Sequence, residues 1–192
     1  MLAMIMKIRN GGFTLIELIV TIAIAAILAG LAVPSFVQYQ RNSELTSLAN
    51  SLLAAVNTAK GEAMKTGRNA FVIPQGSGWN SGWIVYVDMN RDGSYTQGTD
   101  TAIQAQDAPK SYFNITGNNT AAGSAPYIKF DNSGFSVDNS AAPVALSLTI
   151  ARTDTSSSSA LEETRRIVVA RTGRVRTCKP STDSSCTSSA TQ

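Results

Sequence analysis

Two arginines near the C-terminus have the type and spacing to hold an anion. They lie in the segment GRVRTC, residues 173–178, where one residue separates Arg174 from Arg176. A guanidinium stays charged at biological pH and can donate two parallel hydrogen bonds to a phosphate. In a strand over residues 166–176 the two side chains would share a face, about 6.6 Å apart, with Val175 pointing into the core. The alternative is a solvated basic strand that deters aggregation at a sheet edge.

Charge is unevenly distributed around this segment. The protein has 192 residues and a net charge of +3, and 15% of its residues are charged. Residues 164–180 hold six basic side chains and no acidic one, whereas residues 88–107 hold four aspartates and one arginine. Arg171 and Lys179 flank the arginine pair and would widen a basic patch. Such a patch attracts polyanions more strongly than the net charge suggests.

The acidic segment contains a candidate calcium site. Asp88, Asn90 and Asp92, followed by Gly93, have the spacing of the first half of an EF-hand loop. The twelfth position is Thr99, where such a loop has a bidentate glutamate. A β-turn, in which Asn and Gly supply the tight backbone angles, accounts for the same residues. We expect the turn, with calcium as the alternative.

The chain contains no histidine, which argues against catalysis. The commonest general base, the Ser–His and Cys–His nucleophile pairs and most zinc sites all need histidine. No other cluster of residues in the sequence assembles a reactive site. We therefore expect a protein that is not an enzyme and that uses no cofactor.

An apolar segment near the N-terminus predicts a membrane-spanning helix. It runs from Phe13 to Phe36, and its 24 residues would extend about 36 Å as a helix, enough to cross a bilayer. Positive charge before the segment predicts a cytoplasmic N-terminus. Glu17 is costly in hydrocarbon unless it is paired, and cleavage after Gly12 would supply a neighbouring copy's amino group as its partner. The alternative, an ordinary secretory signal, lacks a small-x-small cleavage site after the apolar segment.

The segment GFTLIELIVTIAIAAILAGLAVPSF resembles the class III signal of type IV pilins and type II secretion pseudopilins. Gly12, Phe13, Glu17 and Pro34 all fall at the positions where the family has them. The resemblance implies that a prepilin peptidase cleaves between Gly12 and Phe13 and that Phe13 becomes N-methylated. It also implies that Glu17 aligns subunits in a filament built with other major and minor pilins.

The remaining chain predicts a soluble head over residues 35–192. Residues 35–66 continue the helix and end before Gly67. Residues 70–180 contain short strand patterns separated by Gly, Asn, Ser and Pro clusters. Residues 181–192 are rich in Ser and Thr and predict a flexible tail. An apolar stripe along the helix indicates its core-facing side and comprises Phe36, Tyr39, Leu45, Leu48, Leu52, Val56, Ala59 and Ala63.

These elements predict an α+β fold of the type IV pilin kind. A long N-terminal helix, with a membrane half and an amphipathic half, would pack on an antiparallel β-sheet. Residues 1–12 would be a cleaved leader, and residues 13–34 the transmembrane and filament-core half of the helix. The resemblance implies a single-pass inner-membrane protein before assembly. Afterwards it would be a subunit of a pilus or pseudopilus in the periplasm and at the cell surface.

Two further motifs refine the family. GWIVYVDMNRDGSY resembles a segment of the GspH/FimT branch, where a Trp-led strand runs into an Asp–Asn–Gly turn. GRVRTC resembles the GRxR motif of FimT-type minor pilins. This resemblance implies non-specific binding of extracellular DNA through Arg174 and Arg176, with Arg171 and Lys179 beside them, during DNA uptake in natural transformation. The alternatives are a GspH-like pseudopilin of type II secretion and a FimU-like structural or priming minor pilin.

The two cysteines predict a disulfide beside the arginines. Cys178 and Cys186 enclose seven residues, and the oxidising compartment of an exported domain favours a bridge. A loop this short would stabilise the fold by about 2–3 kcal/mol and hold the tail near Arg176. Opening the bridge is expected to loosen the tail and weaken DNA binding. Two free thiols are the alternative.

We predict that the mature protein begins at Phe13 and carries a methylated amino group, because of the Gly12–Phe13 junction and the position of Glu17. The intact mass of the membrane-extracted protein measures this directly. A mature N-terminus after residue 30 would contradict the pilin interpretation.

Glu17→Ala is expected to leave export and folding of the head intact, because the residue lies outside the predicted head. Incorporation into filaments should be abolished, because the carboxylate would no longer pair with the Phe13 amine of a neighbouring copy. Immunoblots of purified filaments measure incorporation. Wild-type levels of the variant there would show that Glu17 has another role.

Overall fold

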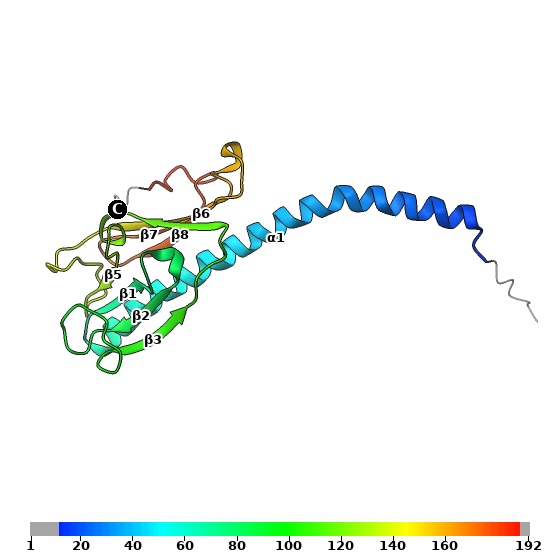
Figure 1. Ribbon diagram of the computed structural model, residues 1–192. Helices are drawn as coiled ribbons and strands as arrows, with labels where there is room; N and C mark the ends of the chain where they lie inside the picture. The colour runs from blue at the N-terminus through cyan, green and yellow to red at the C-terminus, as the bar shows by residue number, and fades with distance from the viewer. Residues whose placement is uncertain (1–11, 189–192) are drawn as a thin grey trace, which may run out of the picture. The chain divides into compact units, whose positions relative to one another are not determined.

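The structure is a computed structural model that describes residues 12–188. A 52-residue helix, α1 (Leu15–Thr66), is followed by eight short strands in this part of the chain (Figure 1). The chain divides into two compact units, residues 1–41 and 42–192. Residues 1–11 of the predicted leader and 189–192 of the predicted tail lie outside the described residues.

The first unit is the N-terminal part of α1. The amide of Glu17 donates to Oγ1 of Thr14, 3.3 Å away, at the start of the helix. The helix is long and apolar enough to cross a membrane, as judged by length and composition. Phe36 and Tyr39 are 66% and 73% exposed. The predicted core stripe is therefore wrong at these two residues, since the hydrophobic core begins at Leu45.

The second unit is built around residues 42–66 of α1. Leu45, Leu52, Val56, Ala59 and Ala63 are buried, which confirms the apolar stripe over this part of the helix. The helix ends at Thr66, as predicted. Gly67 follows with φ +66°, and its amide donates to the Ala63 carbonyl at 3.0 Å. A left-handed residue just after the last turn is a common helix end that favours glycine.

One face of this helical segment packs on a four-stranded antiparallel sheet with the order β3-β2-β1-β5. Alternate residues point to the helix, because successive side chains of a strand lie on opposite faces. Val72 and Val85 are paired across β1 and β2 and belong to the core. Phe71 and Tyr86 are paired on the opposite face, where their rings stack 5.1 Å apart. The strands are β1 (Ala70–Pro74), β2 (Trp83–Val87), β3 (Thr101–Gln106) and β5 (Ile128–Phe130).

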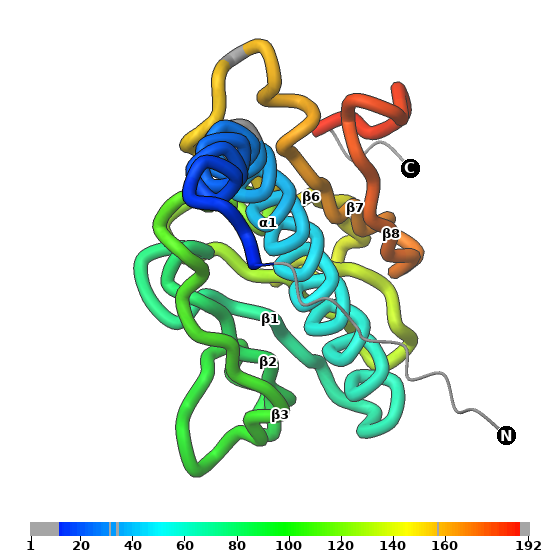
Figure 2. The backbone as a smooth tube through the Cα atoms, turned by 90° about the vertical axis from the view of Figure 1, so that its right-hand side faces the viewer, coloured from blue at the N-terminus to red at the C-terminus, as the bar shows by residue number. Residues whose placement is uncertain are grey.

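A second four-stranded antiparallel sheet has the order β4-β6-β7-β8, with β8 at its edge. Residues 153–163 connect β6 to β7 as a hairpin loop. Figure 2 shows both groups of strands beside the part of α1 drawn in cyan. The strands are β4 (Phe113–Gly117), β6 (Leu146–Arg152), β7 (Thr164–Val169) and β8 (Val175–Cys178).

The predicted fold class is confirmed, with antiparallel sheets packed on one long helix. The described head nevertheless has two sheets where the sequence suggested one. The core residues all fall between Leu45 and Val169, so residues 42–192 contain a complete hydrophobic core. Three short 3-10 helices complete the connections: η1 (Trp79–Ser81), η2 (Asn119–Ala121) and η3 (Ser157–Ser159).

Candidate nucleic-acid interface

The basic C-terminal segment folds as a hairpin of β7 and β8. The strand predicted over residues 166–176 is wrong, because β7 ends at Val169 and β8 begins at Val175. Between them the amide of Gly173 donates to the Ala170 carbonyl at 2.8 Å, and the amide of Ala170 donates to the Arg174 carbonyl at 2.9 Å. Gly173 has φ +74°, which fits the left-handed position of a three-residue hairpin loop.

Gly173 also attaches this turn to the rest of the head. A Cβ at residue 173 would lie 1.8 Å from the carbonyl oxygen of Gly134, so no other residue fits without moving the backbone. Lys60 Nζ, from α1, donates to the Gly173 carbonyl at 2.9 Å. The amide of Ser136 donates to the Arg171 carbonyl at 3.2 Å. The glycine of the GRxR segment is therefore a close-contact residue that fixes the direction of the hairpin.

Arg174 and Arg176 line the same surface pocket, of about 200 Å³. The other lining residues are Val168, Ala170 and Thr172, and none of them is charged. Arg174 is exposed, whereas Arg176 is partly buried. Val175, between them, packs against the hydrophobic core. The two arginines thus line one pocket, as their alternation in the sequence predicts.

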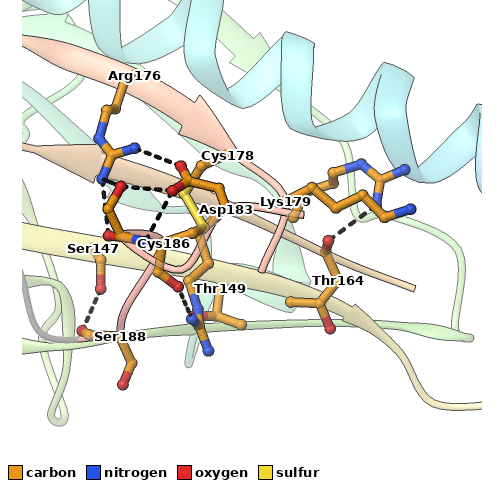
Figure 3. The surroundings of a disulfide bond; sticks show 12 residues. Ser147, Thr149, Thr164, Arg176, Cys178, Lys179, Asp183, Cys186 and Ser188 are labelled. Atoms are coloured by element: carbon orange, nitrogen blue, oxygen red, sulfur yellow. Dashed lines mark hydrogen bonds and ion pairs between the residues drawn. A yellow bond between two sulfur atoms is a disulfide. The ribbon is translucent and has the colours of Figure 1, made fainter. Parts of the chain in front are cut away.

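Arg176 already has an anionic partner within the chain. Its Nη1 lies 3.0 Å from Oδ2 of Asp183, and its Nη2 donates to the Ser185 carbonyl at 3.0 Å (Figure 3). The side chain of Arg176 is 25% exposed and that of Asp183 is 35% exposed. Sequence reasoning missed this ion pair. The available signal was an aspartate inside the loop that the two cysteines close.

The disulfide is formed, between Cys178 and Cys186. Cys186 is buried, and its carbonyl accepts a hydrogen bond from Arg166 of β7. Two residues later the Ser188 carbonyl accepts from Ser147 Oγ at 2.7 Å and from the amide group of Asn118. The prediction of a flexible tail from residue 181 therefore does not hold as far as Ser188. Long-range hydrogen bonds and the disulfide attach this Ser-rich segment to the sheet.

Asp183 is held as a carboxylate by its surroundings. The Ser185 hydroxyl and the Ser185 amide donate to it at 2.6 and 2.9 Å, and these bonds, together with Arg176, lower the pKa of the Asp183 carboxyl. Because the folded-state pKa is lowered, the contact stabilises the loop above the ordinary aspartate pKa. That stabilisation is lost as the pH falls through the lower folded-state value.

The remaining two predicted DNA-binding residues lie in different places. Arg171 is exposed at the tip of the turn. Lys179 lines a separate pocket of about 240 Å³, together with Arg165 and with Thr46 of α1. Arg165 donates to Asn42 Oδ1 at 2.8 Å, and burial lowers the pKa of its guanidinium. The structure brings Arg174 and Arg176 together, with Arg171 near them in the chain, and leaves Lys179 outside their pocket.

The acidic turn after β2 is held by its own backbone. The carboxylate of Asp88 accepts from the amides of Arg91 and Gly93, at 2.6 and 3.0 Å. That of Asp100 accepts from the amides of Met89 and Thr96, at 2.9 and 2.7 Å. Both aspartates are buried. The hydrogen bonds from the Arg91 and Gly93 amides to Asp88 are those of a turn. Within residues 12–188 no group of three or more His, Cys, Asp or Glu side chains is arranged to hold a metal ion.

Comparison with known proteins identifies the family. Residues 48–173 match the family described as Type II transport protein GspH. The chain belongs to this family. Residues 7–33 match the prokaryotic N-terminal methylation motif, which indicates a prepilin peptidase substrate anchored in the inner membrane. Within the GspH family, the FimT-type assignment rests on the GRxR resemblance alone.

A type IV pilin is similar to part of this chain. The type IV major pilin protein PilA of Myxococcus xanthus (strain DK1622) is 48% identical over 52 residues, which make up 27% of this chain. The match spans only 23% of the length of PilA.

Solved structures share the fold of this GspH-family chain. The type IV minor pilin FimU of Pseudomonas aeruginosa (strain PAO1) is 16% identical with a TM-score of 0.56, over 74% of this chain and 94% of FimU. The minor pseudopilin EpsH from the type 2 secretion system of Vibrio cholerae is 15% identical with a TM-score of 0.51, over 71% of this chain and 98% of EpsH. The chain is thus a member of the GspH family with the fold of type IV pilin-like proteins.

Gly173→Ala is expected to lower the free energy of unfolding of the head by about 3 kcal/mol, because the added methyl group would overlap the Gly134 carbonyl. Gly67→Ala is the matched control, since its φ is +66° and nothing lies within 4 Å of the position of its Cβ. The control should lose only about 1 kcal/mol. Urea unfolding measures both values. Equal losses would mean that backbone conformation alone, without the Gly134 contact, requires glycine at residue 173.

Proposed function

We propose that this protein is a minor pilin that binds extracellular DNA through the β7–β8 hairpin during DNA uptake in natural transformation. The observation that carries the proposal is the shared surface pocket of Arg174 and Arg176. Guanidinium groups recognise phosphate bidentately and keep their charge at biological pH. Arg171 at the tip of the turn adds a third cation close in sequence.

The surroundings of the arginines favour contact with the DNA backbone. The other residues of the pocket carry no side-chain amide that could read base edges. Contacts to phosphate position a protein on DNA without selecting a sequence. Binding is therefore expected to be weak and independent of sequence, in the range of about 10⁻⁴ to 10⁻⁶ M that non-specific DNA binding reaches at physiological salt.

The proposal includes the route by which the hairpin reaches DNA. Residues 13–34 would anchor the protein in the inner membrane in a single pass with a cytoplasmic N-terminus. After cleavage at Phe13 by the prepilin peptidase, the protein would join other major and minor pilins in a filament. The methylation motif over residues 7–33 and the likeness of the chain to PilA support this route. The filament would carry the head, with its basic hairpin, away from the membrane.

A second candidate function is a purely structural subunit, either a type II secretion pseudopilin or a priming minor pilin. The family description as a type II transport protein and the fold likeness to EpsH and FimU support it. In that role the hairpin would contact an acidic surface of a neighbouring subunit. This interface needs no affinity for DNA.

Replacing Arg174 and Arg176 together by Gln is expected to reduce DNA binding of the head, residues 35–192, and to lower transformation. With three phosphate contacts, log affinity should fall with log salt concentration at a slope of about −2.7, and the double variant should flatten this slope by about two units. Removal of a surface ion pair such as that between Arg176 and Asp183 costs at most about 1 kcal/mol, so the melting temperature should change little. Fluorescence anisotropy with a duplex at several salt concentrations measures the slope.

The matched control removes two positive charges elsewhere, by Lys65→Gln in α1 and Arg91→Gln in the connection after β2. This variant should keep most of the wild-type slope, because neither residue lies in the hairpin. A hairpin variant with the wild-type slope would rule out the DNA-binding role. If that variant instead fails to enter filaments while its DNA affinity is unchanged, the structural function is correct.

A further inference from the structure

The loop closed by Cys178 and Cys186 carries a carboxylate to Arg176. Asp183 contacts Arg176 at 3.0 Å, and Ser185 adds its carbonyl to the same guanidinium at 3.0 Å. Arg176 is one of the two charged residues of the pocket. Figure 3 shows Asp183 and Cys186 gathered beside Arg176, next to the disulfide. The position that a phosphate would occupy at Arg176 is thus taken by a side chain of the same protein.

The loop is folded around this carboxylate. The amide of Asp183 donates to the Lys179 carbonyl at 3.0 Å, and the Asp183 carbonyl accepts from the amide of Cys186 at 3.0 Å. The hydroxyl and amide of Ser185 both donate to Asp183 Oδ1. The other carboxylate oxygen, Oδ2, is directed to Arg176. Local hydrogen bonds together with the disulfide therefore hold Asp183 in place, and the ion pair does not depend on a mobile side chain alone.

We propose that Asp183 is an internal competitor for the anion site, which DNA phosphate must displace from Arg176. This inference rests on the proposed DNA-binding function and adds its regulation. A carboxylate and a phosphate use the same planar donors of a guanidinium, so they cannot both hold that edge of Arg176. Exposed Arg174 is the first contact in this scheme, and Arg176 joins once its ion pair with Asp183 has broken. By occupying Arg176, the loop lowers the affinity of the arginine site for weakly binding anions, while the site itself remains.

This arrangement changes the expected effect of the disulfide. From the sequence, opening the bridge between Cys178 and Cys186 was expected to weaken DNA binding by loosening the tail. Because the loop carries Asp183, opening it should release Arg176 and strengthen binding. The intact bridge would therefore keep the affinity of the hairpin low.

Asp183→Asn in the head, residues 35–192, is expected to raise DNA affinity about two- to fivefold at fixed salt, the range that a surface ion pair permits. The slope of log affinity against log salt should stay the same, because DNA displaces Asp183 in the wild type as well. Asp107→Asn, after β3 in the other sheet, removes the same charge away from the hairpin. This control should raise affinity by less than half as much. Fluorescence anisotropy with a duplex measures all three proteins.

A double-mutant cycle makes the test specific to the ion pair. In an Arg176→Gln background, Asp183→Asn should give no larger gain than Asp107→Asn. A gain that persists in that background, or equal gains for the two Asn variants in the wild type, would overturn the inference.

A titration with pyrophosphate, monitored by NMR of the arginine side chains, separates this inference from the proposed function. If Asp183→Asn strengthens pyrophosphate binding at Arg176 while no variant binds DNA, the internal competitor is correct and the DNA-binding function is wrong. If DNA binds the wild type and Asp183→Asn changes affinity for neither ligand, the function stands and the competitor is wrong.

Discussion

The close approach of Gly173 to Gly134 is the contact on which the candidate site depends. It brings the turn of the β7–β8 hairpin against the backbone of the connection after β5, at a separation that leaves no room for a Cβ. Lys60 from α1 donates to the same residue, so helix, connection and hairpin meet at one point. Arg174 and Arg176 follow immediately in the chain. Backbone packing therefore sets the direction of these two arginines independently of their charge.

The second constraint is electrostatic, and it differs from what the basic C-terminal segment of the sequence predicts. A run of basic residues suggests an open cationic surface, but the fold supplies Asp183 to Arg176 from inside a disulfide loop. Lys179 is directed to a different pocket, beside Arg165 and α1. The exposed cations of the turn are Arg171 and Arg174. Under the proposed function, such a site would bind polyanions modestly, so that the hairpin could hold DNA and later release it.

The sequence predicted the features that local patterns control. The end of α1 before Gly67 and the buried stripe from Leu45 to Ala63 follow from helical periodicity and the left-handed preference of glycine. The disulfide followed from the loop length and the exported compartment. The helix before Gly67 could therefore be predicted from residues that lie close together in the sequence.

The features that depend on distant partners could not be predicted. The strand β3, Thr101–Gln106, is made of small and polar residues, and its pairing with β2 holds it in the sheet. The segment after Pro180 has the composition of a flexible tail, yet Arg166 and Ser147 attach it through hydrogen bonds. Because the alternation of side chains continues through residue 176, the sequence predicted one strand and no turn at Gly173. In each case the missing information was the partner across the fold.

The central claim is that the β7–β8 hairpin is the surface that meets DNA. Backbone amide NMR of the head, residues 35–192, titrated with a short duplex tests it most directly. If the hairpin binds DNA, the largest chemical-shift changes will fall on residues 171–176 and 183–185, with β3 and its neighbours unaffected. Binding that shifts the β1–β3 sheet while the hairpin resonances stay unchanged would contradict it.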